Sequence, residues 1–256
     1  MQLHHPIRIP LLFTLFALVF TATAQMARAG GNDFHADFDA LLRANVASGL
    51  VFYPGFENPR FDAYLKKLAA AQPESWPRNE KLAFWINAYN ACAIRQVLDN
   101  ARLAQPIDKA DFFKEKKFSV AGRTVSLDQI ENEIIRPQFN EPLIHFGVVC
   151  AARGCPPLLN TAYTADRLMD MLKNNLKSYL GSAAGMRIDR TAGTIHLSRI
   201  FEWYRVDFGN SDDKVIEFIA AHTDSQTAAW IKQHRSTVKL AWIDYDWTMN
   251  RRAAKP

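Results

Sequence analysis

Residues 142–158, PLIHFGVVCAARGCPPL, combine an apolar run with two cysteines and a closing pair of prolines. The apolar run is of the kind that indicates a short strand inside a sheet, and it ends at Cys150. A tight loop carrying Cys155 would follow, and the prolines would end it. Two further residues with usable chemistry, His145 and Arg153, fall in the same stretch, which makes it the first candidate for a functional site.

A long, very hydrophobic helix is expected upstream, over residues 79–100. Apolar side chains lie on nearly every side of its middle, which is typical of a helix buried in the core. Asn87 and Asn90 lie in that middle, and residues three apart are neighbours on a helix surface. An unpaired buried amide costs about 1–3 kcal/mol, so each asparagine needs a partner. They either hold a long loop through its backbone or orient a catalytic group, and the first role is the commoner one for buried polar side chains.

The rest of the chain mixes helical and hairpin patterns. Helices are expected over 32–50, from a cap at Asn58 through Leu68, from a capping box at Ser126 to Arg136, from a cap at Thr164 through Leu180, and near 214–222 and 226–234. Hairpins are expected in KFSVAGRTVS and MRIDRTAGTIHLS, and a last strand in VKLAWIDYDW. Because there is no regular βαβ alternation, the order predicts an α+β fold. We expect a single mixed domain over 32–246, with helices packed on a small, mostly antiparallel sheet around the buried central helix.

The N-terminus has the pattern of a signal peptide. Arg8 precedes the apolar run LLFTLFALVF at 11–20, and small residues then allow cleavage after Ala24 or Ala29. The run is shorter than the roughly 20 residues that a membrane span needs, and no later run approaches that length. The sequence therefore predicts a periplasmic or secreted protein with no integral membrane segment once residues 1–24 are removed.

The formal net charge of +5 overstates how basic the folded part is. Arg8 leaves with the signal peptide, and Arg251, Arg252 and Lys255 fall in a basic tail, 247–256, that we expect to be frayed. A nucleic-acid-binding protein should concentrate Lys and Arg on one face, and no such cluster is visible. We expect no nucleic-acid partner; the sequence does not identify any other.

Three cysteines in an exported protein allow one disulfide and one free thiol. Sequence alone leaves all three pairings among Cys92, Cys150 and Cys155 open, and the last two are the nearest pair along the chain. A structural disulfide, a thiolate nucleophile activated by Arg153, and a redox or metal role are all compatible with the C-x4-C spacing. The spacing matches redox motifs and zinc sites poorly, so we predict no metal and no cofactor.

A base for such a nucleophile is harder to place. In a regular strand His145 and Cys150 would point to opposite faces, so they could not form a direct pair. His196, at the end of a hairpin strand, is the best remote candidate. A lone buried histidine such as His145 is more often a satisfied core residue than a base.

The segment LSRIFEWYRVDF is rich in aromatic residues. Most of them are expected in the core, but Trp203 and Tyr204 could line a groove. Asp207 either caps or pairs with a neighbouring charge, or contributes to a site.

Three stretches together resemble one known family: FWINAYN at 84–90, IHFGVVCAARGCPPL at 144–158 and LSRIFEWYRVDF at 197–208. The chain is similar over roughly 75–246, SLDQIENEIIR included, to the domain of unknown function 547 family of exported bacterial proteins and plant proteins. The resemblance implies these signature positions: Asn87, Tyr89, Asn90, His145, Cys150, Cys155, Pro156, Trp203, Tyr204 and Asp207. It also implies that Cys92 is the odd thiol. The family has no established activity, so the resemblance implies a fold and a site but no reaction.

Two functions remain open. The first is a thiol-dependent hydrolase or acyl transferase, in which a cysteine attacks, a histidine acts as base and an asparagine orients it. Its candidate catalytic residues are Cys150, Cys155, His145, Asn87 and Asn90, and its candidate substrate-binding residues are Arg153, Trp203, Tyr204 and Asp207. The second is a non-catalytic binding or accessory module with a structural Cys150–Cys155 disulfide. A catalytic thiol held in a disulfide would exclude the first.

Overall fold

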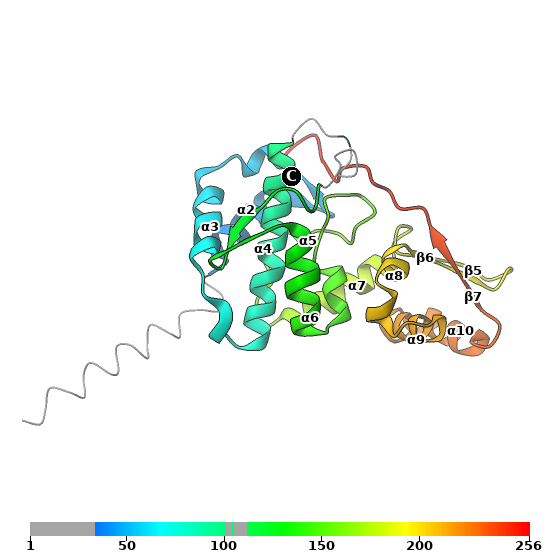
Figure 1. Cartoon of the computed structure of the whole chain (residues 1–256). Helices are drawn as coiled ribbons and strands as arrows, with labels where there is room; N and C mark the ends of the chain where they lie inside the picture. The colour runs from blue at the N-terminus through cyan, green and yellow to red at the C-terminus, as the bar shows by residue number, and fades with distance from the viewer. Residues whose placement is uncertain (1–33, 101–103, 105–111) are drawn as a thin grey trace, which may run out of the picture.

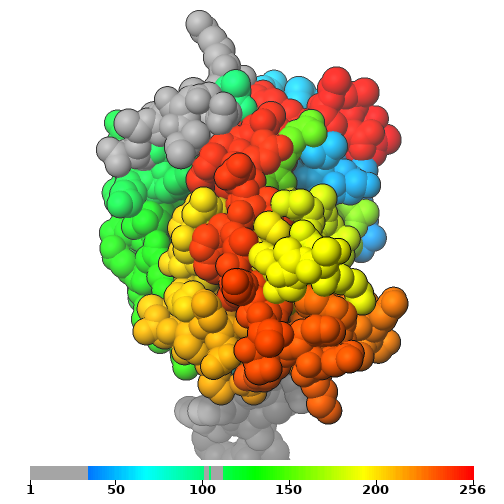
Figure 2. Space-filling view, turned by 90° about the vertical axis from the view of Figure 1, so that its right-hand side faces the viewer, coloured from blue at the N-terminus to red at the C-terminus, as the bar shows by residue number. Residues whose placement is uncertain are grey.

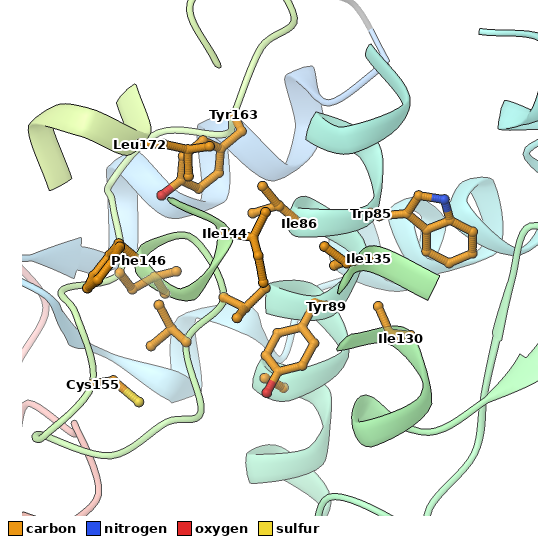
Figure 3. Close-up of a cluster of buried hydrophobic side chains, with 14 of the residues drawn as sticks. Trp85, Ile86, Tyr89, Ile130, Ile135, Ile144, Phe146, Cys155, Tyr163 and Leu172 are labelled. Carbon is orange, nitrogen blue, oxygen red and sulfur yellow. The ribbon is translucent and has the colours of Figure 1, made fainter. Parts of the chain in front are cut away.

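Helix α4, Arg78–Asp99, lies in the middle of the protein (Figure 1). The computed structural model describes residues 34–100, 104 and 112–256. Every residue from Leu82 to Ile94 is buried, so the predicted central helix is confirmed. Figure 3 shows part of the surrounding core, in which Ile86 and Tyr89 of α4 share the interior with side chains from several other segments.

The remaining elements are shorter helices and strands, of which those in the N-terminal half lie around α4 and those of the C-terminal half lie to one side of it (Figure 1). The other helical segments are α2 (Ala36–Asn45), η1 (Tyr53–Phe56), α3 (Pro59–Ala70), η2 (Pro73–Ser75), α5 (Leu127–Gln129), η4 (Ile130–Ile135), α6 (Arg136–Phe139), η5 (Pro142–Phe146), α7 (Leu168–Leu180), α8 (Ile200–Trp203), η6 (Arg205–Phe208), α9 (Asp212–His222) and α10 (Ser225–His234). The strands are β1 (Val46–Ala47), β2 (Leu50–Val51), β3 (Phe118–Val120), β4 (Arg123–Val125), β5 (Met186–Asp189), β6 (Thr194–Ser198) and β7 (Lys239–Ile243). This mixture confirms the α+β class.

The strands are distributed over three small sheets in the described part of the chain, where we expected one. Strands β1–β2 and β3–β4 form antiparallel pairs, and β6 lies between antiparallel β5 and parallel β7. The two predicted hairpins, with turns at Gly122 and Gly193, are confirmed. Each strand has at most five residues. Helices α3 and α5 and the turns η1, η2 and η4 pack against α4, whereas α7 packs against η5 and α9, and α9 against α10.

The expected strand within 142–158 is wrong. Residues 142–146 form the helical turn η5, which Pro142 opens and the Glu141 carboxylate caps by accepting from the Leu143 N–H (3.1 Å). A short apolar run does not by itself distinguish a buried strand from a buried helical turn. The turn is stable without a neighbouring strand because side-chain amides satisfy its backbone: Asn175 donates to the Phe146 carbonyl (2.6 Å).

Helix α7 begins later than expected. Thr164 was expected to cap it, but the helix begins at Leu168 after Arg167. The Thr164 carbonyl instead accepts from the Arg167 N–H (3.3 Å), so a separate turn stands between Thr164 and the helix. The cap at Asn58, which accepts from the Arg60 N–H, is confirmed.

The C-terminal segment leaves β7 and returns across the protein to its N-terminal half (Figure 1). Figure 2 shows it in red on one face, between the yellow β5–β6 hairpin and the gold region around α8. Asn250 donates its N–H to the Ala151 carbonyl (2.9 Å), and its own carbonyl accepts from the Val51 N–H (2.8 Å). Met249 and Asn250 are buried, so the prediction of a frayed tail from residue 247 is wrong up to at least Arg252, which donates to the Val51 carbonyl.

The predicted signal peptide, residues 1–24, lies outside the described residues. Across 34–100, 104 and 112–256, no helix has both the length and the apolar character that crossing a membrane requires.

Candidate functional site

A cavity of about 420 Å³ opens beside the C-terminal half of α4. Its size lies within the usual range for small-molecule sites. Its wall combines residues from α4, the helical stretch 127–139, the loop after η5, helix α8 and the C-terminal segment. We call this cavity the aromatic pocket, because much of its wall consists of aromatic side chains: Tyr89, Phe113, Trp203, Tyr204, Tyr245 and Trp247.

An ion-pair network that includes the buried His145 adjoins the aromatic pocket. The Nε2 of His145 lies 2.7 Å from Oδ2 of Asp207. Arg136 donates to both oxygens of the same carboxylate, through Nε at 2.7 Å and a terminal nitrogen at 3.0 Å. The Tyr204 ring stacks on the imidazole with centroids 3.9 Å apart. Asp207 therefore joins a histidine on η5 to an arginine on α6.

Glu131 is the second carboxylate of this network, and it is almost fully buried. Its Oε1 lies 3.6 Å from Nδ1 of His145, which is ion-pair distance and longer than a hydrogen bond. Glu131 lies on η4, a π-helical turn in which the Arg136 N–H bonds back to the Glu131 carbonyl five residues earlier. Such wide turns occur often at functional sites. The predicted capping box of Ser126 and Gln129, which starts this helical stretch, is confirmed.

The network sets the protonation of its members. Burial alone would lower the pKa of His145, but the Asp207 and Glu131 carboxylates outweigh it and raise the pKa above 6.5. Burial alone would raise the pKa of Asp207, yet His145 and Arg136 hold it well below its ordinary value. Burial, reinforced by the Glu131 charge, raises the pKa of Tyr204 well above 10. The acidic partners of His145 therefore favour the charged form of its ring.

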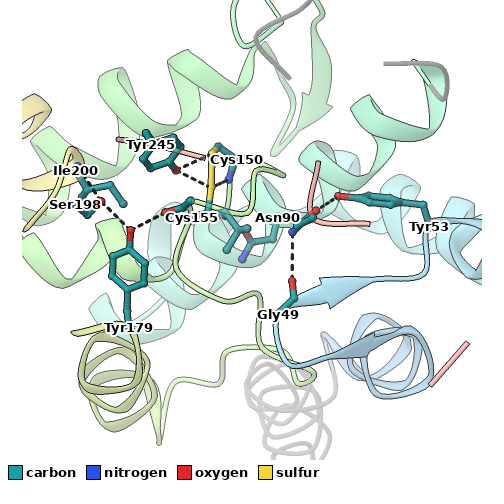
Figure 4. Close-up of a disulfide and its surroundings, with 12 residues drawn as sticks. Gly49, Tyr53, Asn90, Cys150, Cys155, Tyr179, Ser198, Ile200 and Tyr245 are labelled. Atoms are coloured by element: carbon teal, nitrogen blue, oxygen red, sulfur yellow. Dashed lines mark hydrogen bonds between the residues drawn. A yellow bond between two sulfur atoms is a disulfide. The ribbon is translucent and has the colours of Figure 1, made fainter. Parts of the chain in front are cut away.

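The loop after η5 carries the two cysteines of the motif, which form a disulfide in the wall of the aromatic pocket (Figure 4). Asn90 fixes the start of this loop, since it donates to the Gly147 carbonyl (2.8 Å) and accepts from the Val149 N–H (2.9 Å). Asn87 makes the same two-way link to the backbone of Tyr163. Both asparagines thus hold loops, which confirms the commoner of their two expected roles.

The C-terminal segment that follows β7 packs against the disulfide loop. The N–H of Gly154 donates to the Asp246 carbonyl (2.7 Å), and a side chain at Gly154 would come within 2.9 Å of the Asp246 nitrogen. This close approach places Tyr245 and Trp247 against Trp203, with the three ring centroids 4.7 to 5.7 Å apart. We call these three rings the aromatic platform.

The structure brings together most of the site residues expected from the sequence. His145, Cys150, Cys155, Trp203 and Tyr204 line the aromatic pocket, and Asp207 bonds to His145. Asn87, Asn90 and Arg153, the remaining expected residues, do not line this pocket.

Asn87 and Asn90 bond to loop backbone, and the structure shows no hydrogen bond from either to His145 or to a cysteine. Arg153 is exposed and lines a second cavity of about 580 Å³ across the disulfide loop. His196, the remote base candidate, lies on β6 opposite Arg187 and is not part of the aromatic pocket.

The sequence did not point to four residues that lie at or beside this cavity. Glu131 and Arg136 belong to SLDQIENEIIR, and the signal that would have found Glu131 is a carboxylate on the apolar side of a helix, beside Ile130 and Ile134. Tyr245 and Trp247 were assigned only to the last strand and its end. No pattern in the sequence indicates that the C-terminal segment returns to the pocket.

The described residues form a cavity with charged and aromatic walls. Neither cysteine in its wall is a free thiol, and the third cysteine, Cys92, is buried in α4, where burial raises its pKa far above 9. Within the described ranges, no three His, Cys, Asp or Glu side chains are grouped as a metal site requires.

Comparison with known proteins gives one match. Residues 73–180 match the family model described as "Protein of unknown function, DUF547", which confirms the resemblance over this segment. The matched segment contains α4, the helical stretch 127–139, η5 and the disulfide loop, whereas Trp203, Asp207 and Tyr245 lie beyond it. Neither the curated proteins nor the solved structures contain a match.

Proposed function

We propose that this protein is an exported binding module whose aromatic pocket takes a saccharide-like ligand, that is, a ring with an apolar face and hydroxyl groups. The observation that carries the proposal is the aromatic platform of Trp203, Tyr245 and Trp247 in the wall of a cavity that also holds carboxylates. Aromatic rings supply a large apolar contact area at low entropic cost.

The spacing of the platform favours a stacked ring over a cation. A cage for a cation needs rings on several sides of an open centre. Here the centroids are 4.7 to 5.7 Å apart, so the rings contact one another and leave no room between them. The planes of Trp203 and Trp247 lie 30° apart, and that of Tyr245 is inclined by 56° to 57° to both. The ring available to the apolar face of a sugar is therefore Trp203, which is the most exposed of the three.

Charged groups beside the platform suit the hydroxyl groups of such a ligand. Asp128 and Glu131 line the aromatic pocket and lie three residues apart, hence on one side of their helix. Lys114 lines it as well. Carboxylates accept hydrogen bonds from hydroxyl groups and an ammonium group donates to them, so a few polar groups set the orientation of a ring that the platform holds.

The oxidised loop favours binding over thiol-dependent hydrolysis or acyl transfer. Such an enzyme needs a free thiolate within hydrogen-bonding distance of its base. Cys150 and Cys155 are bonded to each other, and His145 is bonded to Asp207. The pattern of residues 1–24 and the disulfide both support export, which N-terminal sequencing of the mature protein would test.

Binding is tested with a panel of mono- and oligosaccharides, amino sugars included, by titration calorimetry and tryptophan fluorescence on the mature protein. We expect at least one class to bind, and Trp203→Ala to weaken it about tenfold or more, as loss of a central aromatic contact does. Trp203 is 47% exposed, so its removal should leave the fold intact. Val206→Ala is the matched control, because Val206 is 69% exposed, follows three residues later and lies outside the pocket. Absence of any saccharide response, or equal binding by Trp203→Ala, would overturn the proposal.

A further inference from the structure

The Cys150–Cys155 disulfide differs from a staple hidden in a core, because it forms part of a cavity wall. Both cysteines line the aromatic pocket, and Cys155 also lines the second cavity across the loop. Cys150 is only partly buried, whereas Cys155 is 7% exposed. A thiol that enters the aromatic pocket therefore meets the sulfur of Cys150 more readily than that of Cys155.

Two hydrogen-bond donors converge on the less exposed sulfur (Figure 4). The backbone N–H of Cys150 donates to Sγ of Cys155 at 3.0 Å, and the Tyr245 hydroxyl donates to the same atom at 3.1 Å. The hydroxyl also lies 3.3 Å from Sγ of Cys150, so it faces both sulfurs and is nearer to Cys155, which alone also has the backbone donor. Burial raises the pKa of Tyr245 well above 10, so the hydroxyl keeps its proton and remains a donor. A disulfide sulfur is a weak acceptor and a thiolate is a strong one, so this arrangement favours a negative charge on Cys155.

We propose that Cys150–Cys155 is an exchange-active disulfide, which oxidises dithiols that enter the aromatic pocket by attack at Cys150. The accessible sulfur lies toward the incoming thiol, and the sulfur that must leave already has the donors that a leaving thiolate needs. This inference goes beyond the proposed function, because it concerns the wall of the pocket and not the ligand on the platform.

The oxidation of a dithiol proceeds by two successive thiol–disulfide exchanges. A substrate thiolate attacks Sγ of Cys150, a new S–S bond forms to the substrate, and the Cys150–Cys155 bond breaks. The electron pair of the broken bond stays on Cys155, whose thiolate the Cys150 N–H and the Tyr245 hydroxyl stabilise. The second thiolate of the substrate then attacks the substrate sulfur of the mixed disulfide and releases Cys150. Two electrons and two protons pass from the dithiol to the two cysteines, and a small-molecule disulfide restores the starting state by the reverse exchange.

The test follows reduction of the folded, mature protein without any saccharide present. Glutathione serves as the monothiol probe and dithiothreitol as the dithiol, with alkylation and peptide mass spectrometry to locate the adduct. We expect a glutathione adduct on Cys150 with Cys155 free. We also expect Tyr245→Phe, which removes one hydroxyl, to slow the exchange by about tenfold, because a hydrogen bond to a charged group is worth roughly 1.5–3 kcal/mol.

Tyr179→Phe provides the matched control. The Tyr179 hydroxyl donates to the Gly154 carbonyl in the same loop but contacts neither sulfur. Its removal loosens the loop, so reduction should proceed at the same rate or faster. Circular dichroism and thermal unfolding confirm that both variants remain folded.

Three results would overturn the inference: an adduct on Cys155, reduction that requires unfolding, or a Tyr245→Phe variant that is reduced as fast as Tyr179→Phe. None of them depends on saccharide binding, which Trp203→Ala tests separately. Failure of one proposal is therefore distinguishable from failure of the other.

Discussion

His35 and His145 are both buried histidines among aromatic rings, yet the structure gives them opposite electrostatic surroundings. They are 4% and 2% exposed. Nδ1 of His35 lies 2.6 Å from the Tyr64 hydroxyl, and no carboxylate is among the groups that shift its pKa. Burial, with the Lys67 charge as a smaller cause, lowers the pKa of His35 to about 3.

His145 has acidic partners on both sides of its ring. Asp207 bonds to one ring nitrogen, and Glu131 lies 3.6 Å from the other. These carboxylates overcome the burial that would lower the pKa, and they raise it above 6.5. Burial alone therefore does not decide whether a histidine is neutral, because the groups that face its two nitrogens do.

The comparison separates a structural histidine from a candidate functional one. His35 occupies the N-cap position of α2 without a capping bond from its side chain, and its ring lies in an aromatic cluster with Phe34 and Phe84. His145 lines an open cavity, and its acidic partners favour the charged form of the ring. Perturbed groups with specific charged partners in a cavity are typical of functional sites.

The largest effect is expected from Asp207→Asn. The change removes the carboxylate to which both His145 and Arg136 bond. His145 is buried and Asp207 is 23% exposed, so the cost should lie at the low end of that for breaking a buried pair. We expect the free energy of unfolding to fall by about 3 kcal/mol and the pKa of His145 to fall. Urea denaturation and NMR titration of the histidines measure the two effects.

Asp212→Asn is the control for this change. Asp212 also pairs with an arginine, Arg205, but its side chain is 59% exposed. Pairs of this kind contribute about 0–1 kcal/mol, so the control should lose little. Equal losses in the two variants would show that the network around His145 is an ordinary surface pair.

A smaller loss is expected from Asn90→Ala, which tests how the backbone positions His145. The change leaves the buried Gly147 carbonyl and Val149 N–H without their partner, and we expect a cost of about 2 kcal/mol. Denaturation and the rate of disulfide reduction measure it, because the same loop carries Cys150. Asn100→Ala, at the end of the same helix, removes a bond only to the Gln96 carbonyl and should cost less than half as much.

The sequence predicts many of the helices and turns that position this site, but few of the long-range contacts that complete it. Helix α4, the capping box at Ser126 and both hairpins follow from local signals, namely apolar periodicity, a cap and glycine turns. The disulfide loop is also local, because Cys150 and Cys155 are five residues apart.

The rest depends on contacts between distant parts of the chain. Asp207 meets His145 across 62 residues, and Tyr245 meets Cys155 across 90. No periodicity encodes such contacts. The strand expected at His145 shows the same limit, because side chains of α4 and α7 satisfy the backbone of this stretch in place of a neighbouring strand.

Tyr64→Phe tests the hydrogen bond between Tyr64 and His35. It removes only the hydroxyl bonded to His35 and leaves the aromatic packing in place. Loss of one buried hydrogen bond should cost about 1 kcal/mol. Thermal and urea unfolding measure this cost, and the titration of His145 should not change. A shift in that titration would mean that the two regions are coupled.

The smallest effect, and the one that compares the two histidines most directly, is the pH dependence of stability. The folded pKa of His35 lies below its unfolded value, so its contribution is complete above pH 6.5 and is lost as the pH falls toward 3. The folded pKa of His145 lies above its unfolded value, so its contribution is complete below pH 6.5 and is lost as the pH rises through the folded value. Asp207, with a lowered pKa, loses its contribution only in acid.

Replacement of each histidine by glutamine should therefore give opposite slopes. The cost of His35→Gln should shrink by about 0.8 kcal/mol as the pH falls from 7.5 to 6. The cost of His145→Gln should instead shrink as the pH rises. Urea denaturation of both variants and the wild type across this range measures the slopes. Lys67 and Tyr64 face the first ring, and Glu131, Asp207, Arg136 and Tyr204 surround the second. Slopes of the same sign would mean that the two carboxylates do not hold a proton on His145, and the electrostatic distinction between the two histidines would then be lost.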